Sequence, residues 1–283
     1  MVPPHTSPPH DNTSPPCRKT GFFTGKAGYY ARYRRGYPPE VFDTIISRFG
    51  LTLSSEILDL GCGTGNVAIP LAERGFHVFA VDPEPEMREE GWKRAEAGHI
   101  PGISWMAGAD STLATLGLPR LRLCTMGLSF HWMDRPRVLA ILDALIEPGG
   151  GIACITRTDG FYCHLHDGWG GAVKAVLEEM LGERWDYSGR LKKKIQNDEN
   201  KNEEIFAQSP FPSTEAIEFP VRTTLTVDEI IGHQLSTSYI DPVLVGERND
   251  EFRDRLTKRL LELEPSGTFT DESTIHLIIA KRT

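Results

Sequence analysis

A glycine-rich turn is the part of this sequence with the clearest capacity to bind a ligand. Residues 59–65 read Asp-Leu-Gly-Cys-Gly-Thr-Gly, directly after the apolar run 56–60 and ahead of an amphipathic stretch that ends at Gly75. This order predicts a strand, a tight turn and a helix. Glycines are needed there because the chain reverses sharply and a ligand must approach bare backbone, which a Cβ atom would obstruct. The same turn could also connect a strand to a helix and bind nothing.

Two carboxylates follow the next two expected strands. Asp82 ends the run at about 77–81, where it could accept hydrogen bonds from both hydroxyls of a ribose. Asp110 ends the following strand, in the order Met-Ala-Gly-Ala-Asp-Ser over 106–111. The carboxyl ends of parallel strands meet at one edge of a sheet, so both acids are expected beside the glycine turn. Each acid taken alone could instead cap a helix or occupy a turn.

Strand-like and helical patterns alternate along most of the chain, which predicts an α/β fold with a parallel sheet and right-handed crossovers. The expected strands lie at about 56–60, 77–81, 103–107, 121–126, 151–156, 215–223 and 274–280. Helices are expected at about 84–97, 136–146, 169–181, 227–236 and 246–262. No crossover helix stands directly before the last strand, so that strand is expected to be antiparallel.

Composition narrows the class of protein. Lys and Arg number 31 against 39 Asp and Glu, a formal net charge of −8, which disfavours a nucleic-acid partner. No apolar stretch approaches the roughly 20 residues that span a membrane, so we expect no membrane partner. Five scattered cysteines suit reduced thiols and a cytoplasmic protein. The Pro-rich residues 1–20 are expected to be disordered, and 21–283 to form a single domain.

The glycine turn, Asp82 and Asp110 together resemble class I S-adenosylmethionine-dependent methyltransferases that act on small molecules. Residues 30–38, Tyr-Ala-Arg-Tyr-Arg-Arg-Gly-Tyr-Pro, are similar to the Y-x-x-Y-R-P-x-Y-P segment of trans-aconitate and ubiquinone-type methyltransferases, with Arg35 in place of the usual proline. The segments 128–132 and 147–150 are similar to the "HW … L-x-P-G-G" run of the same group. Enzymes of this outline also occur in natural-product pathways.

The resemblance implies a Rossmann-like, seven-stranded, mostly parallel sheet with an antiparallel final strand and helices on both faces. It divides the chain into N-terminal lid helices (21–50), a cofactor-binding core (51–160), substrate-side insertions that include a C-terminal helical insertion (161–273) and the last strand (274–283). The implied cofactor is S-adenosylmethionine, with its methionine part on the glycine turn, its ribose on Asp82 and its adenine amino group beside Asp110. The implied cofactor-binding residues are Tyr30, Arg34, Asp59, Gly61, Gly63, Gly65, Asp82, Met87, Asp110 and Ser111.

Methyl transfer from a sulfonium mainly requires alignment, so a catalytic base is optional. For a hydroxyl or amine acceptor, His131 is the candidate base, because it follows the fourth strand. For a carbon acceptor, aromatic faces would stabilise the developing cation. The expected substrate-binding residues are Tyr33, Trp132, His164 and Trp169. No metal is expected, because the Cys-His-Leu-His-Asp segment at 163–167 is too compact to close a tetrahedral site unaided.

Other functions remain open at this point. A glycine turn followed by an acid also describes a nicotinamide-dependent oxidoreductase, although G-x-G-x-G differs from the G-x-G-x-x-G spacing of that class. A protein that binds S-adenosylmethionine without transferring its methyl group is a second alternative. The acceptor is expected to be small and hydrophobic, methylated on carbon or oxygen. Residues 22–37 would form a lid over the cofactor, or else pack on the flank of the sheet or exchange with a second subunit to give a homo-oligomer.

Overall fold

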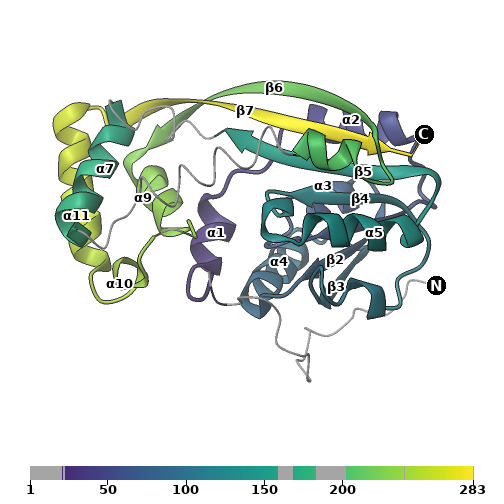
Figure 1. Ribbon diagram of the computed structural model, residues 1–283. Helices are drawn as coiled ribbons and strands as arrows, with labels where there is room; N and C mark the ends of the chain where they lie inside the picture. Colours follow the sequence, from purple (N-terminus) through teal and green to yellow (C-terminus); the bar gives the residue numbers. More distant parts are fainter. Residues whose placement is uncertain (1–20, 22, 159–167, 183–201, 239, 283) are drawn as a thin grey trace.

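The computed structural model describes residues 21, 23–158, 168–182, 202–238 and 240–282 of the 283-residue chain (Figure 1). Within these residues seven strands form one sheet, in the order β3-β2-β1-β4-β5-β7-β6. The strands are β1 (Glu56–Leu60), β2 (His77–Asp82), β3 (Ile103–Ala107), β4 (Leu121–Gly127), β5 (Ile146–Thr158), β6 (Ser213–Thr226) and β7 (Thr268–Lys281). β1 to β5 pair in parallel, whereas β7 is antiparallel to both β5 and β6. The prediction of a mostly parallel, seven-stranded sheet with an antiparallel final strand is confirmed.

Helices cover both faces of the sheet, because alternate residues of each strand point to opposite sides. Ile57 enters a buried cluster with α2 (Pro39–Phe49) and α3 (Ala68–Glu73), while the next residue, Leu58, enters a second cluster with α5 (Arg135–Leu145). Burial on both faces explains why the central strands read as nearly continuous apolar runs. The helix α4 (Pro85–Ala97) packs against β2 and β3.

The last two strands form a long hairpin that leads to a separate group of helices. β6 and β7 pair from Ser213 and Lys281 to Thr226 and Thr268. At that far end, Leu225 and Phe269 join a buried cluster of four helices, which we call the helical lobe (Figure 1). The lobe consists of α7 (Gly168–Leu181), α9 (Val227–Leu235), α10 (Pro242–Val245) and α11 (Asn249–Leu263).

Both strands of this hairpin are longer than predicted. The residues that extend β7, 268–273, read Thr-Phe-Thr-Asp-Glu-Ser and lack the apolar run that marks 274–280. They are nevertheless a strand because β6 supplies their backbone hydrogen bonds and one alternate residue, Phe269, is buried in the lobe. β5 likewise begins at Ile146 rather than at 151, because Ile146 pairs with Leu121 ahead of a register shift.

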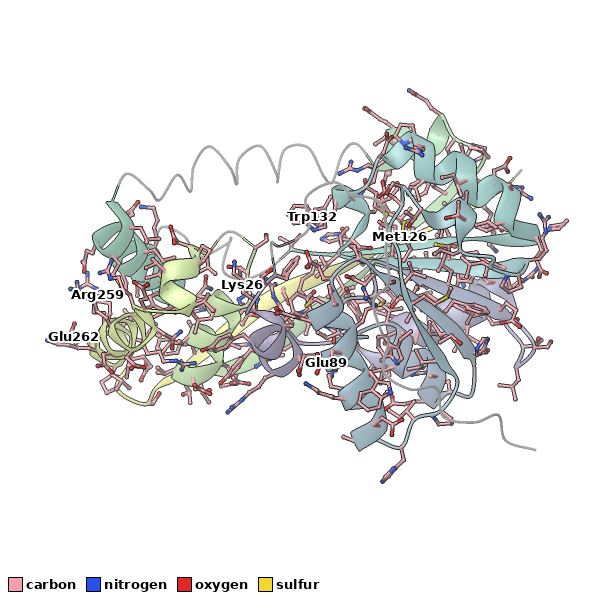
Figure 2. All side chains as sticks on the ribbon, turned by 90° about the horizontal axis from the view of Figure 1, so that it is seen from below. Lys26, Glu89, Met126, Trp132, Arg259 and Glu262 are labelled. Atoms are coloured by element: carbon pink, nitrogen blue, oxygen red, sulfur yellow. The ribbon has the colours of Figure 1, made fainter. Side chains whose placement is uncertain are left out.

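A short helix, α1 (Ala27–Tyr33), lies between the helical lobe and the sheet region, where it packs against α9 and α4 (Figure 1). Figure 2 shows the same arrangement from below. Lys26 lies in the middle, with the lobe residues Arg259 and Glu262 on one side and the part that carries Glu89 and Trp132 on the other. The Pro-rich tail 1–20 lies outside the described residues. Of the described helices, none combines the length and the apolar composition needed to cross a membrane.

Candidate active site

The glycine turn begins where β1 ends, and its backbone has the conformation that glycine allows. Gly61, Gly63 and Gly65 have φ values of 72°, 53° and 83°, in the left-handed region that other residues rarely adopt. A Cβ atom on Gly61 would lie 2.5 Å from the Ser129 Cβ, so a side chain there would collide with the loop after β4. The turn therefore presents bare backbone at the carboxyl edge of the sheet.

Asp82 closes the end of β2 against this turn. Its Oδ2 accepts a hydrogen bond from the Gly63 N–H at 2.8 Å, and its Oδ1 accepts one from the Glu84 N–H at 2.9 Å. Burial raises the pKa of Asp82 to about 6, although these two hydrogen bonds and the nearby Arg88 oppose the rise. The carboxylate is buried in protein and still borders the cavity described below.

Asp59 has a different position from Asp82, although both acids lie at or near the end of a strand. Its Oδ2 accepts from the Ala68 N–H at 3.1 Å, and its Oδ1 accepts from the Thr125 hydroxyl at 3.0 Å. Burial raises its pKa to about 7, and the negative charge of Asp82 adds to this. Asp59 thus connects β1 to the start of α3 and to β4 from beneath the turn.

A cavity of about 550 Å³ lies where β1, β2 and β4 end. This is the edge at which open α/β sheets bind ligands, and the volume is within the usual range for small-molecule sites. Its wall is formed by Phe23, Tyr30, Leu60, Gly61, Gly63, Asp82, Pro83, Glu84, Met87, Ala109, Asp110, Gly127, Leu128, Ser129, Trp132 and Met133. Asp110 is held there by the Asp134 N–H, which donates to its Oδ2 at 2.9 Å.

Seven residues that the sequence singled out meet in this wall: Tyr30, Gly61, Gly63, Asp82, Met87, Asp110 and Trp132. Asp59 and Ser111 each adjoin a wall residue in sequence, and Gly65 follows Gly63 by two residues, but none of the three forms the wall. Gly65 faces Ile69 and Trp105, each of which would lie 2.9 Å from an added Cβ atom. One predicted substrate residue, His164, falls outside the described residues.

The remaining predicted residues lie outside the wall. Arg34 donates from Nε to the Ser236 hydroxyl at 2.9 Å, and its guanidinium lies 5.4 Å from the centre of the Tyr30 ring. Tyr33 packs on α9 rather than on the cavity. Trp169 is buried within the helical lobe. His131 belongs to a single 3₁₀ turn, Phe130–Trp132, and its ring centroid is 5.0 Å from that of Trp132. The predicted role of each stays a prediction.

The structure adds cavity residues that were not among the predicted site residues, namely Phe23, Glu84, Leu128 and Met133. Leu128 has a φ of 53°, a strained value for a non-glycine residue, at the point where the chain leaves β4. Glu84 and Met133 could have been found by including the two or three residues that follow each predicted strand end. Phe23 lies in the segment 22–37 that was expected to form a lid, but no pattern within that segment singles it out from its other aromatic residues.

Comparison with known proteins agrees with this geometry. Residues 57–150 match the methyltransferase domain family. An uncharacterized methyltransferase of Mycobacterium tuberculosis is 29% identical over 144 residues, which are 48% of this chain and 52% of that protein. A malonyl-[acyl-carrier protein] O-methyltransferase of Serratia marcescens is 33% identical over 115 residues, 40% of this chain and 43% of its own. The chain spans about half the length of the curated relatives it matches.

Two solved structures share the fold across most of the chain. A putative type II methyltransferase from Anaeromyxobacter dehalogenans has a TM-score of 0.55 at 20% identity, covering 88% of this chain and 98% of that one. A methyltransferase from Thiobacillus denitrificans, solved with S-adenosylhomocysteine, has a TM-score of 0.50 at 13% identity and covers 92% and 98%.

The sheet order and the matched domain agree with one another. Residues 57–150 match the methyltransferase domain family, and the chain shares the fold of solved methyltransferases, one of which was solved with S-adenosylhomocysteine. The resemblance to S-adenosylmethionine-dependent methyltransferases that the sequence predicted is supported by both comparisons.

Proposed function

We propose that this protein transfers a methyl group from S-adenosylmethionine to a small, hydrophobic metabolite. The observation that carries the proposal is the 550 Å³ cavity, which combines the glycine turn, Asp82 and Asp110 with an apolar wall. A cavity of this composition can hold a polar nucleoside and an apolar acceptor side by side.

The residues at the edge of the sheet suit this cofactor. Gly61 and Gly63 leave backbone exposed where a Cβ atom would meet Ser129 or Met87, so the turn can lie against the methionine part. Each carboxylate oxygen of Asp82 accepts one backbone N–H and retains a lone pair. The two oxygens together can therefore accept hydrogen bonds from both ribose hydroxyls. Asp110 is available for the adenine amino group.

The alternative of a nicotinamide-dependent oxidoreductase is less well supported. Dinucleotide-binding sheets of that class have the order 3-2-1-4-5-6 with parallel strands. Here β7 lies between β5 and β6 and is antiparallel to both. A dinucleotide cofactor would need a site for a second nucleotide. The described residues that border this cavity include one glycine-rich turn, that of Gly61 and Gly63.

The bound cofactor would supply a methyl group already activated on a sulfonium, so the protein's contribution is to bind and to align. Good alignment of this kind is worth about 7–11 kcal/mol. We propose His131 as the base for a hydroxyl or amine acceptor. His131 is not itself in the cavity wall, but its ring lies beside that of Trp132, which is. For a carbon acceptor, the rings of Tyr30 and Trp132 are the aromatic faces in that wall.

The hydrophobic acceptor is supported by Phe23, Leu128, Trp132 and Met133, which contribute apolar surface to the cavity wall. A structure with a TM-score of 0.54 is described as a putative methyltransferase from an antibiotic biosynthesis pathway of Anabaena variabilis. It shares the fold at 16% identity. Within this proposal the reaction is a carbon or oxygen methylation in a natural-product pathway.

Two experiments test the proposal in sequence. Calorimetry should detect binding of S-adenosylhomocysteine and none of NAD, and the opposite result would refute the methyltransferase assignment. Incubation with methyl-labelled S-adenosylmethionine and a metabolite extract, followed by mass spectrometry, should yield a labelled small product. Binding of S-adenosylhomocysteine without any labelled product from broad extracts would favour the non-catalytic binding protein.

A further inference from the structure

We propose that Asp228 is a positioning residue for the cofactor: it fixes α1 to the helical lobe and thereby holds Phe23 and Tyr30 in the cavity wall. The inference rests on the proposed function, since it concerns the same cofactor site. Asp228 itself lies on α9, outside the cavity, so it would act on binding only through α1.

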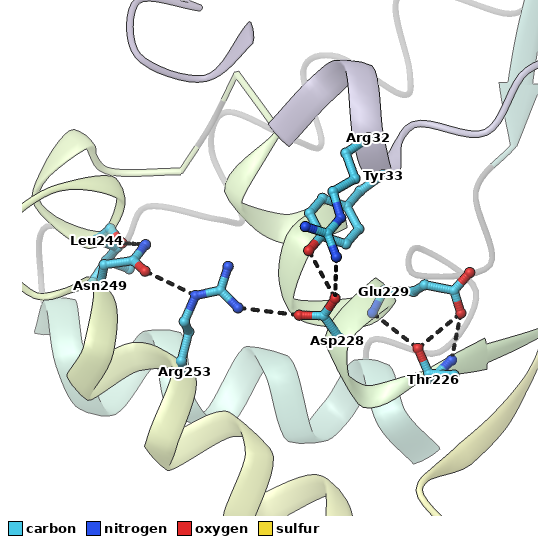
Figure 3. Close-up of polar contacts among 8 residues, drawn as sticks. All are labelled: Arg32, Tyr33, Thr226, Asp228, Glu229, Leu244, Asn249 and Arg253. Carbon is cyan, nitrogen blue, oxygen red and sulfur yellow. Dashed lines mark hydrogen bonds and ion pairs between the residues drawn. The ribbon is translucent and has the colours of Figure 1, made fainter. Parts of the chain in front are cut away.

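The Asp228 carboxylate contacts side chains from two other helices (Figure 3). The Tyr33 hydroxyl of α1 donates to its Oδ2 at 2.8 Å, and the Arg32 guanidinium lies 3.6 Å from the same oxygen. From α11, Arg253 donates to Oδ1 at 3.3 Å. The carboxylate stands in the first turn of α9, where the helix dipole favours a negative charge. One side chain therefore joins α1, α9 and α11.

The helix α1 depends on such contacts for its position. It has only seven residues, and an isolated helix of that length is marginal in water. The Tyr33 ring lies so close to α9 that a Cβ atom on Gly232 would be 2.3 Å from it. Just before α1, the buried Lys26 ammonium donates to the carbonyls of Thr237 and Ile240 at 3.1 and 3.0 Å. On this side the segment is therefore bound to the lobe region at both ends of α1.

The opposite side of the same segment is bound to the methyltransferase domain. The Glu84 carboxylate accepts the Gly21 N–H at 2.5 Å, and the Glu86 carboxylate accepts the Gly25 N–H at 2.8 Å. Glu84 also forms part of the cavity wall. Residues 21 and 23–33 therefore bridge the lobe and the cofactor site, and the lobe contacts hold the end of this bridge that carries Tyr30 and Tyr33.

Phe23 and Tyr30 are the two side chains through which the bridge reaches the cavity. Their rings meet edge to face with centroids 5.7 Å apart, and both line the cavity. Tyr30 and Tyr33 stand three residues apart on one helix, so they are neighbours on its surface. A shift of Tyr33 away from Asp228 therefore displaces Tyr30 from the cavity wall.

The effect should be graded rather than all or none. The Asp228 side chain is 53% exposed, and exposed ion pairs contribute little each. Lys26 and the Tyr33 ring would still hold α1 near α9 without the carboxylate. We expect Asp228→Ala to weaken S-adenosylhomocysteine binding by about three- to tenfold while the protein remains folded.

The experiment compares Asp228→Ala with a matched control by calorimetry and by thermal unfolding. Glu251→Ala removes a carboxylate of α11 whose ion pairs, within the described part of the chain, are with Arg248 and Arg255. The control should leave S-adenosylhomocysteine affinity unchanged. Tyr33→Phe removes only the hydroxyl donor, so it gives a second measurement if Asp228→Ala proves unstable, and it should weaken binding in the same direction.

The decisive arm repeats Asp228→Ala in a Phe23→Ala, Tyr30→Ala background. There the substitution should weaken binding no further, because the two rings that carry the effect are absent. Equal weakening in both backgrounds, or no weakening in the otherwise unaltered protein, would overturn the positioning role. If the unaltered protein failed to bind S-adenosylhomocysteine at all, the proposed function would be at fault instead.

Discussion

Asp82→Ala removes the carboxylate that joins the end of β2 to the glycine turn. In the structure this carboxylate accepts the backbone N–H groups of Gly63 and Glu84 and also borders the cavity. With the cofactor bound, its loss would leave two ribose hydroxyls without their acceptor. An unmade hydrogen bond of this kind costs about 1–3 kcal/mol, which corresponds to a dissociation constant about 5- to 150-fold higher.

Calorimetry can isolate that contribution from damage to the turn. S-adenosylhomocysteine should bind Asp82→Ala more weakly by the stated factor, whereas an analogue without ribose hydroxyls should bind the variant and the unaltered protein about equally. Asp82→Asn serves as the control, because its amide oxygen can still accept one backbone N–H. An unchanged S-adenosylhomocysteine affinity in Asp82→Ala would place the ribose elsewhere and refute the assignment.

The same carboxyl group predicts a pH dependence. Burial raises the pKa of Asp82 to about 6, and the ribose hydroxyls need the ionised form as acceptor. As pH falls through about 6, the carboxylate gains a proton and S-adenosylhomocysteine affinity should fall. In Asp82→Asn this component of the pH dependence should vanish. The free energy of unfolding should change in the opposite direction. Because the pKa of Asp82 is higher in the folded than in the unfolded chain, its contribution to folding stability is most favourable at a pH below the unfolded pKa and is lost as the pH rises.

Three further outcomes are expected. Gly61→Ala should weaken S-adenosylhomocysteine binding and lower the unfolding midpoint, because an added Cβ atom would lie 2.5 Å from Ser129 Cβ; an unchanged midpoint would contradict this. Burial lowers the pKa of Lys26 to about 8, so folding stability should rise between about pH 8 and 10.5, and urea unfolding of Lys26→Met should lack this rise. His131→Gln should reduce turnover of a hydroxyl or amine acceptor by roughly 10²–10⁴-fold without altering S-adenosylhomocysteine affinity. Unchanged turnover in a kinetic assay would exclude His131 as the base.

The sheet could be predicted because its central strands are buried on both faces and therefore consist largely of consecutive apolar residues. β1, β2, β3 and β4 lie within a residue or so of their expected bounds. The outer hairpin was harder to delimit, since its residues 268–273 are half polar and become a strand through pairing with β6. Local composition does not encode a partner strand that lies far away in sequence.

The cavity was predictable where a residue ends a strand, as Asp82 does, or follows one closely, as Gly61 and Asp110 do. Tyr33 and Trp169 show the limit of that reasoning. An aromatic side chain has the same sequence signal whether it faces a ligand or a helix, and these two face α9 and the interior of the lobe. Their direction depends on how α1 and α7 pack, which no pattern within either helix determines.

Asp59 and Asp82 have different roles because they occupy different positions along their strands. Asp59 is one residue short of the end of β1, so its side chain lies under the turn, where Ala68 and Thr125 donate to both oxygens. Asp82 is the last residue of β2, so its carboxylate meets the cavity. Burial raises the pKa of both, and the negative charge of Asp82 raises the pKa of Asp59 further. Donors that reach Asp82 from a bound ribose would therefore stabilise the ionised form of the acid that faces the ligand, while Asp59 maintains the turn beneath it.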